Sequence, residues 1–423
     1  MSPLRSYAAA VRSFSPNARR YLLFTALLGV GTSFQWLFFN LYVLSLGHDQ
    51  AFVGLLASIP ALVTAVSALP IGFLLPRIGY RRGLFVATGL LAAAFAGWAL
   101  LPSVPILIAG CVLAGLGSAL LFILSSPLMV AASDSGTRTH LFGVQFGLNT
   151  LVGVVANFAG GHLPRLFASG FGFAAESPIA YRAVLLVAMA LALASLLPVS
   201  RLRGLEAERQ RRGVRWRDLA GHRSTLAKLL ILQGTVALGA GMLMPFVNVF
   251  FKLRFQLPDP SLGAVFAASS LMTGLAAMAA PILANRLGKL KAIVLSQGLS
   301  LPFLVAMGFS PWFELSAAGF LIRTALMNMS SPLFMAFTMG LVPAKLRPLT
   351  SGVMAFAWNG GWALSSWLSG KIQVASGFAP LFIITGSLYV TVVALTYVFL
   401  RHAREIEESE IVEQLHVDEE ERI

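Results

Sequence analysis

Twelve long apolar runs constrain the fold of this chain more than any other feature of the sequence. Most of them match or exceed the roughly 20 residues that a helix needs to cross the hydrocarbon core of a bilayer. Hydrophobic residues make up 57% of the chain and charged residues only 11%, whereas a soluble domain carries about 25% charged residues. We therefore expect an all-α integral membrane protein with twelve transmembrane helices, at residues 21–46, 51–75, 83–101, 104–131, 140–164, 180–199, 226–252, 261–285, 290–309, 313–341, 350–373 and 379–400.

The basic residues are unevenly divided between the two sides that these spans define. An even number of spans puts both termini on one side, and 25 of the 31 Lys and Arg residues fall in the tails, linker and loops of that side. Four lie in the loops of the other side: Arg165, Arg182, Lys252 and Arg254. The positive-inside rule then places both termini in the cytoplasm and the chain in the cytoplasmic membrane. The net charge of +14 is attributed to this topology and to contact with anionic lipid headgroups, rather than to nucleic-acid binding.

The second half of the chain repeats the first in register. A basic stretch at 72–82 recurs at 281–291, with 209 residues between Arg77 and Arg286, and Asn40 matches Asn248 at a spacing of 208. Because each half has six spans, corresponding helices run in the same direction, which relates two six-helix bundles by a pseudo-two-fold axis along the membrane normal. We expect a cytoplasmic lead-in (1–20), an N-terminal bundle (21–200), a cytoplasmic linker (201–225), a C-terminal bundle (226–401) and an acidic cytoplasmic tail (402–423).

The repeated basic stretch resembles a loop of the major facilitator superfamily, of the prokaryotic twelve-helix type, which has the pattern G-x-L-x-D-R-x-G-R-R between the second and third helices. The first copy keeps Gly72, Leu74, Arg77, Gly79, Arg81 and Arg82, and the second keeps Leu283, Arg286, Gly288, Lys289 and Lys291. The resemblance implies a secondary transporter that works by alternating access, with these loops gating the cytoplasmic side. It implies no enzyme activity, no metal and no other cofactor, and we expect a monomer.

The family's acidic residue is missing from both copies of this loop. Pro76 replaces it in the first copy and Asn285 in the second. In the family this carboxylate pairs with an arginine and faces a helix N-terminus; proline cannot do this, and an amide does it without charge. We therefore expect the cytoplasmic gate to be held by something other than the usual charge pair.

Arg323 is the outlier among the residues of the spans. It lies nine residues after Glu314, hence roughly 13 Å into the membrane at about 1.5 Å per residue. A charge there costs at least about 2.5–3.5 kcal/mol on insertion scales, so it should face a cavity or a partner. The second half's Arg323 corresponds to Ser118 in the first half. Two interpretations stay open: Arg323 binds an anionic group of a substrate, or it holds helices together through partners such as Asn328 or Gln35.

Other candidate substrate-binding residues are amides and aromatic side chains within the spans. The resemblance implies that the first, fifth, seventh and eleventh helices line the central cavity, and buried amides serve equally well as ties between helices. Trp36 and Asn40 share a helix face, as do Trp358 and Trp362, because each pair is four residues apart. The candidates are Gln35, Trp36, Asn40, Gln145, Asn149, Gln233, Asn248, Asn328, Trp358, Asn359 and Trp362.

The expected function is secondary transport of a small organic or amphipathic solute, anionic because of Arg323. No Asp or Glu lies deep in a span, which counts against a carboxylate proton relay and against cationic substrates. The alternative is efflux of a drug or lipid-like solute through a mostly apolar cavity, with a structural Arg323. Against a drug–proton antiporter, the fifth helix keeps that group's glycine pair, Gly160-Gly161, without its proline. A receptor or scaffold that does not transport is the remaining alternative.

Overall fold

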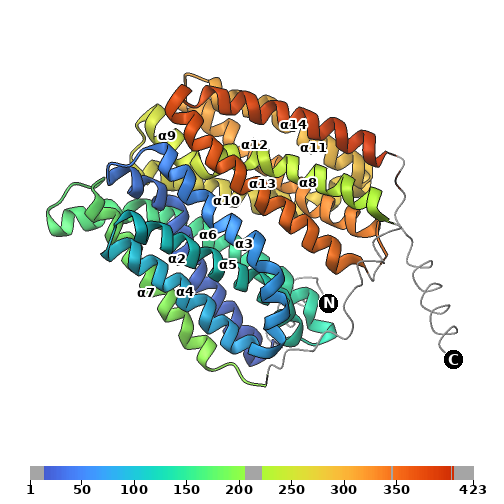
Figure 1. Ribbon diagram of the computed structural model, residues 1–423, viewed down its shortest axis with the longest axis horizontal. Helices are drawn as coiled ribbons and strands as arrows, with labels where there is room; N and C mark the ends of the chain where they lie inside the picture. Colours follow the sequence, from blue (N-terminus) through green and yellow to red (C-terminus); the bar gives the residue numbers. More distant parts are fainter. Residues whose placement is uncertain (1–13, 205–221, 344–345, 402, 404–423) are drawn as a thin grey trace, which may run out of the picture.

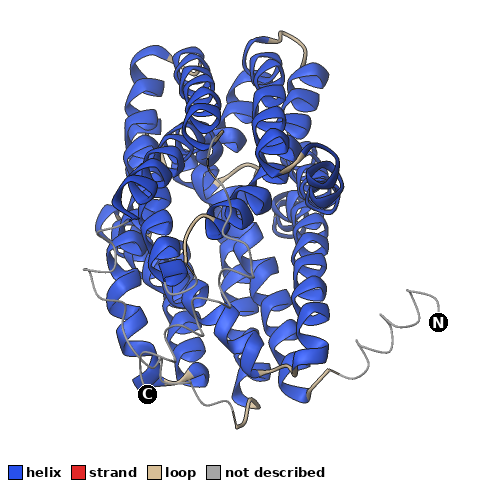
Figure 2. Ribbon diagram, turned by 90° about the vertical axis from the view of Figure 1, so that its right-hand side faces the viewer, coloured by secondary structure: helices blue, strands red, loops and turns tan. Residues whose placement is uncertain are grey.

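The computed structural model describes residues 14–204, 222–343, 346–401 and 403, with the side chains of Leu69, Gly72–Arg77, Ser135 and Pro348 left undescribed. Most of the predicted lead-in, linker and acidic tail therefore lies outside the described residues. All regular structure in the described part is helical (Figure 2). The first half forms α2 (Pro16–Ser45), α3 (Gln50–Ile78), α4 (Tyr80–Leu100), α5 (Val104–Ala131), α6 (Ser135–Phe171) and α7 (Pro178–Ser200).

The second half follows the same order. It forms α8 (Arg223–Leu243), the short 3-10 helix η2 (Met244–Phe246), α9 (Val247–Phe255), α10 (Asp259–Leu287), α11 (Lys289–Phe309), α12 (Phe313–Gly340), α13 (Arg347–Ser376) and α14 (Ala379–Leu400). The two halves make two six-helix bundles side by side (Figure 1), which confirms the predicted fold class. In the described residues eleven spans are long and apolar enough to cross a membrane. One of these spans, Arg223–Phe255, includes α8, η2 and α9. The remaining long helix, α13, has 30 residues but carries several serines and glycines and one asparagine.

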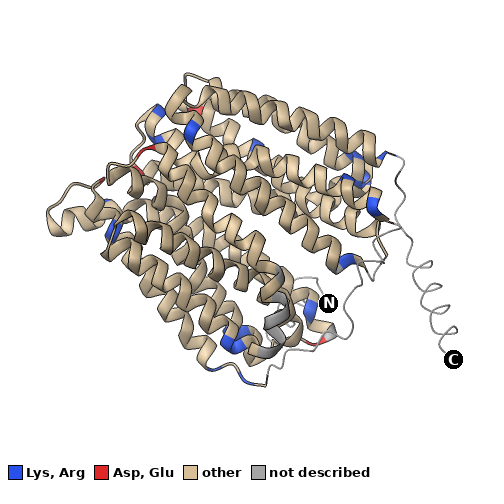
Figure 3. Ribbon diagram, in the orientation of Figure 1, with Lys and Arg blue, Asp and Glu red and all other residues tan. Residues whose placement is uncertain are grey.

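Two ends of the molecule can be distinguished. At the linker end, α2 begins, α7 ends, α8 begins and α14 ends; the opposite end is called the far end (Figure 1). Lys, Arg, Asp and Glu gather at these two ends and are nearly absent from the helices between them (Figure 3). This distribution is what a chain crossing a hydrocarbon layer requires, because a charged side chain at the bilayer centre is costly.

The helix pairs within the two bundles match each other. In the first bundle α2 packs on α7 and α4 on α5; the equivalent pairs in the second are α8 with α14 and α11 with α12. Between the bundles α3 packs on α13 and α6 on α10. The repeat detected in the sequence is therefore also a repeat of helix packing.

The predicted seventh span, 226–252, is interrupted in the structure. α8 ends at Leu243 and α9 begins at Val247, with Pro245 in the intervening η2. Proline has no N–H to bond the carbonyl four residues earlier, that of Gly241. Ser366 of α13 donates to that carbonyl at 3.2 Å instead, and Ser369 donates to Met242 at 2.6 Å. Serine hydroxyls thus satisfy the backbone groups that the break frees inside the membrane.

Candidate functional site

A cavity of about 380 Å³ lies inside the C-terminal bundle, lined by α8, η2, α11, α12, α13 and α14. Its deep end is formed by Arg323 and Tyr389, near the middle of α12 and α14, and by Met244 of η2. Other lining residues, such as Met335 and Thr396, lie closer to the linker end. The cavity therefore extends from mid-membrane toward the linker end. Its volume is within the range of roughly 300–1,000 Å³ that small-molecule sites occupy.

Arg323 is the only charged residue among the described residues that line this cavity. It is 2% exposed. One guanidinium nitrogen, Nη2, donates to the hydroxyl of Tyr389 at 2.7 Å, and Nη1 lies 3.0 Å from the sulfur of Met244. The guanidinium carbon lies 5.3 Å from the centroid of the Tyr389 ring. The third donor, Nε, is buried without a hydrogen-bond partner.

The positive charge of Arg323 has no counter-charge among the described residues, where the ion pairs found involve only Lys252. Neither partner proposed from the sequence is among its hydrogen-bond partners: Asn328 donates to the carbonyl of Thr324 on its own helix, and Gln35 is not among the described residues that line the cavity. A buried charge held by neutral groups alone is expensive. The deep end of the cavity is therefore electrostatically suited to an anion.

The rest of the lining combines apolar bulk with neutral polar groups. The apolar part includes four methionines and three large aromatic residues: Met244, Met327, Met335, Met354, Phe334, Trp358 and Trp362. The hydrogen-bonding groups belong to Gln233, Gln297, Asn328, Ser330, Ser331 and Thr396. Methionine adapts to ligands of irregular shape. No carboxylate is among the described residues of this lining.

A second cavity, of about 460 Å³, lies between the two bundles. Trp36 and Asn149 line it from the first bundle, and Met244, Ser269 and Thr324 from the second. Met244 belongs to both cavities. The two cavities therefore meet at η2, where the helix is broken.

Three tryptophans connect these cavities. Trp36, 57% exposed, meets Trp362 edge-on with 6.4 Å between ring centroids. Trp362 in turn lies 5.9 Å from Trp358. Of the sequence candidates, this brings Trp36, Asn149, Gln233, Arg323, Asn328, Trp358 and Trp362 to the walls of the cavities.

The remaining four amide candidates, apart from Gln35, make other contacts. Asn359 donates to the carbonyl of Ala355 in its own helix, and Gln145 lies near the hydroxyl of Tyr21. Asn40 donates to the carbonyl of Pro245, and Asn248 donates to the carbonyl of Leu37 at 2.9 Å. Whether any of these residues contacts a substrate in another conformation stays a prediction.

The bonds of Asn40 and Asn248 form a reciprocal pair. Each asparagine belongs to one bundle and bonds a carbonyl of the other, and each accepting carbonyl lies three residues before the partner asparagine. The two residues are equivalent in the repeat. This pair therefore joins the bundles across the pseudo-two-fold axis, and it is one of several contacts between them on the far side of the cavities.

Two glycine contacts join the bundles in the same symmetric way. A Cβ added to Gly370 of α13 would lie 2.4 Å from the carbonyl oxygen of Gln50 and 2.9 Å from the Cα of Gly54, in α3. A Cβ on Gly263 of α10 would lie 2.7 Å from the Cα of Gly161, in α6. Gly54 and Gly263 are equivalent in the repeat, and so are Gly161 and Gly370, each pair 209 residues apart. Only glycine allows these helices to approach so closely.

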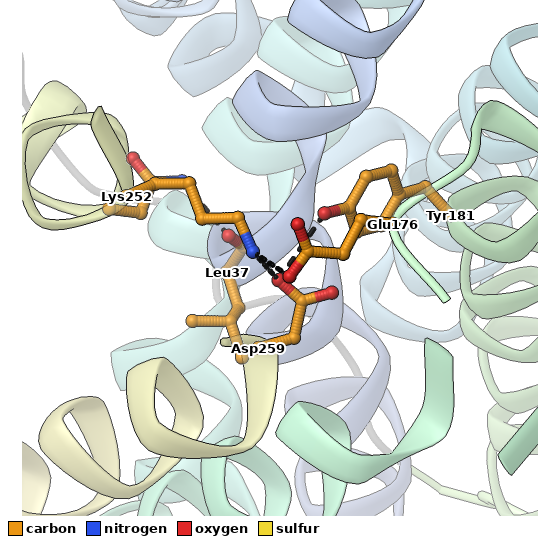
Figure 4. A network of polar contacts seen from close by, with 6 residues as sticks. Leu37, Glu176, Tyr181, Lys252 and Asp259 are labelled. Atoms are coloured by element: carbon orange, nitrogen blue, oxygen red, sulfur yellow. Dashed lines mark hydrogen bonds and ion pairs between the residues drawn. The ribbon is translucent and has the colours of Figure 1, made fainter. Parts of the chain in front are cut away.

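A charged cluster at the far end is not symmetric. Lys252 of α9 bonds Glu176, in the loop after α6, and Asp259, the first residue of α10, at 2.6 Å for the latter (Figure 4). The hydroxyl of Tyr181 in α7 donates to the same oxygen of Asp259 at 3.3 Å. Asp259 is 3% exposed. Two residues of each bundle thus meet here, and the equivalent of Asp259 in the first half is Gln50. The sequence interpretation, which put every acid outside the spans, missed this buried carboxylate.

Comparison with known proteins identifies the family. The model of the Major Facilitator Superfamily matches residues 21–228 and again 229–418. The chain belongs to the major facilitator superfamily. It is thus a multi-pass membrane protein and a transporter of the secondary kind, not an enzyme. No curated protein matches the chain by sequence.

Solved structures of transporters share the fold. The nucleoside transporter NupG is 14% identical with a TM-score of 0.71, over 91% of this chain and 98% of that one. A bacterial homologue of the human lysosomal transporter Spinster, in an inward-facing and occupied conformation, is 16% identical with a TM-score of 0.69, over 95% and 98%. A D-xylose–proton symporter is 12% identical with a TM-score of 0.73, over 90% and 97%.

The two family loops have the same backbone at the linker end. Gly79 precedes α4 with φ of 79°, and Gly288 precedes α11 with φ of 82°, a conformation that favours glycine. Arg81, Arg82, Asn285 and Arg286 are exposed. The side chains of Gly72, Pro76 and Arg77 lie outside the described part of the chain, and the gating role of both loops, with Lys289, stays a prediction.

Proposed function

We propose that this transporter moves a small organic anion with an apolar body by alternating access. The observation that carries the proposal is Arg323, 2% exposed, at the deep end of a cavity in which none of the described lining residues is an acid. An anionic group there would supply the missing counter-charge and accept from the unpartnered Nε. The methionine and tryptophan side chains would hold the apolar body.

The proposal includes an orientation in the membrane. The positive-inside rule puts the linker end, with both termini, in the cytoplasm. The bundles are joined on the far side of the cavities by paired asparagines, paired glycines and the Lys252 cluster. The conformation is then inward-facing. In the transport cycle, residues 21–200 would rock against 226–401, which requires these far-end contacts to separate.

The experiment is a ligand screen on the purified protein, by thermal shift and then by flux into liposomes. Organic anions such as phenylpropionate should stabilise the protein, whereas their methyl esters and cationic drugs should stabilise it much less. Arg323→Gln should lose at least about 2 kcal/mol of anion-binding free energy, which is about thirtyfold in Kd. Arg323→Lys should retain part of the affinity because it keeps the charge.

A matched control is Arg254→Gln, because Arg254 lies at the far end and donates to the carbonyl of Ser310 rather than into a cavity. It should leave anion binding unchanged. Equal anion affinity in Arg323→Gln and the parent protein would contradict the proposal. Stabilisation by neutral lipids or drugs alone would favour the alternative of an apolar efflux cavity with a structural Arg323.

A further inference from the structure

Gln297 is a second buried polar group in the cavity of the C-terminal bundle. It lies in α11, lines the cavity and is 5% exposed. Its Nε2 donates to the hydroxyl of Ser330 in α12 at 3.3 Å. Its other amide atom, the carbonyl oxygen Oε1, is buried without a hydrogen-bond partner. An unpaired buried acceptor is destabilising, so this oxygen is a candidate for contact with a ligand.

The contacts of Ser330 fix which way the amide of Gln297 points. The Ser330 hydroxyl donates to the carbonyl of Met327 at 2.8 Å. A hydroxyl has a single hydrogen to donate, so toward Gln297 it can only accept. The amide nitrogen must therefore face Ser330, and the carbonyl oxygen is left as the free group.

Gln297 and Arg323 occupy different depths of the same cavity. Ser330, the partner of Gln297, follows Arg323 by seven residues along α12, which is about 10 Å at 1.5 Å per residue. Ser330 is on the linker-end side of Arg323. The carbonyl oxygen of Gln297, a hydrogen-bond acceptor, and the guanidinium of Arg323, which can bind an anion, are thus spaced along one wall of the cavity. Methionine and aromatic side chains also line the cavity.

Neither polar group belongs to the repeated scaffold. The equivalent of Gln297 in the first half is Thr88, 209 residues earlier. The bounds of α5 and α12 also differ by 209 residues, so the equivalent of Arg323 is Ala114 and not Ser118 as expected from the sequence. Symmetric packing therefore does not explain a glutamine at this position. The reason for a glutamine at this position must therefore lie in the cavity, which only the second half lines among the described residues.

We infer that Gln297 is a specificity-determining residue, whose Oε1 accepts a hydrogen bond from the substrate about 10 Å from the group that Arg323 binds. The substrate class is then an organic anion that carries a hydroxyl or amino group at the end opposite its charge. This inference rests on the proposed function and narrows its substrate class.

Four probes separate the two contributions: phenylpropionate, its para-hydroxy derivative, and the methyl esters of both. Comparing hydroxylated with plain compounds measures the donor contribution, and comparing acids with esters measures the charge contribution. In the wild-type protein the para-hydroxy acid should bind about fivefold more tightly than the plain acid, a typical net effect of one hydrogen bond. Binding would be measured by calorimetry on the full chain.

The variants test each contribution separately. Gln297→Met, which keeps the length and loses the acceptor, should abolish the donor preference, so that hydroxylated and plain compounds bind equally, among both acids and esters. Gln297→Asn, which withdraws the carbonyl by one methylene, should do the same and retains a polar group if the methionine variant folds poorly. Thr88→Val is the matched control at the equivalent position of the other bundle and should keep the preference.

The outcomes are distinguishable. The inference is overturned if the wild-type protein shows no donor preference, as when a water alone occupies the site, or if the preference survives in Gln297→Met and Gln297→Asn. The proposed function fails separately if acids and esters bind equally and Arg323→Gln changes neither. A donor preference among the esters that depends on Gln297 would support the role of Gln297 even then.

Discussion

The contacts between the bundles and the cavity inside the second bundle follow opposite rules. Between the bundles, contacts occur in symmetry-related pairs: the bond of Asn40 is matched by that of Asn248, and the approach of α3 to α13 by that of α6 to α10. The Lys252 cluster is the exception. In the cavity, the polar groups come from one half and have no polar equivalent of the same kind in the other. Arg323 corresponds to Ala114, and Gln297 to Thr88.

The difference separates two tasks. The symmetric contacts, two asparagine hydrogen bonds and two close glycine approaches, hold the far end closed. A transporter needs a closed far end in one of its states, whatever solute it carries. The asymmetric cavity leaves Nε of Arg323 and Oε1 of Gln297 buried and unpaired, which stability alone does not favour. We therefore expect mutations between the bundles to change the balance of conformations, and mutations in the cavity to change the ligand.

The largest effect is expected for Gly370→Ala. Its Cβ would lie 2.4 Å from the carbonyl oxygen of Gln50, so α3 and α13 would have to separate. Overpacking of this kind costs about 1–3 kcal/mol, which would shift the ratio of far-closed to far-open protein roughly five- to 150-fold. The readout is labelling of Ser269→Cys, in the cavity between the bundles, by an impermeant maleimide added from the far side. Labelling should be faster in the variant.

The control for this prediction is Gly360→Ala, ten residues earlier in the same helix, where a Cβ would meet nothing within 4 Å. The native cysteine, Cys111, is buried and should contribute little background. Equal labelling rates in the two variants would mean that the close glycine approach does not hold the far end shut.

A smaller effect is expected for the asparagine pair. Asn40→Ala and Asn248→Ala each remove one hydrogen bond between the bundles, worth about 1 kcal/mol, or about fivefold in the same labelling assay. Because the two bonds are reciprocal, the two variants should shift labelling in the same direction and by similar amounts. Asn359→Ala, which removes a bond within one helix, should have no effect. Loss of ligand binding without a change in labelling would instead assign these asparagines to the substrate.

Much of the scaffold could be predicted from the sequence because duplication leaves a visible register. The spacing of 208 residues between Asn40 and Asn248 indicated that they are equivalent. It could not indicate that they bond across the axis, because equivalence in a repeat does not specify contact. The same register also contained the matches of Gly54 with Gly263 and of Gly161 with Gly370, a signal that was available in the sequence.

The cavity was harder to predict because its polar residues have no matching residues in the other half of the chain that would mark them. Arg323 stood out as a lone charge in an apolar run, but its partner Tyr389 and the acceptor Gln297 lie in α14 and α11. These helices were not among those expected to line a cavity. Asp259 was assigned to a loop, because polarity alone does not distinguish an exposed turn from the first turn of a helix buried against another bundle.

The smallest effect, and the most direct test of the cavity, is expected for Tyr389→Phe. The change removes the hydroxyl that accepts from Nη2 of Arg323 at 2.7 Å but keeps the ring beside the guanidinium. Without ligand, the free energy of unfolding should fall by about 1 kcal/mol, because a second guanidinium donor is left unpaired. An anion can bond both unpaired donors, Nε and Nη2, so its affinity should rise by roughly two- to threefold. Tyr397→Phe, on the same helix but 52% exposed, should change neither quantity. If Tyr389→Phe lowers stability and anion affinity together, the hydroxyl contributes to the binding site directly instead of competing with the anion for Arg323.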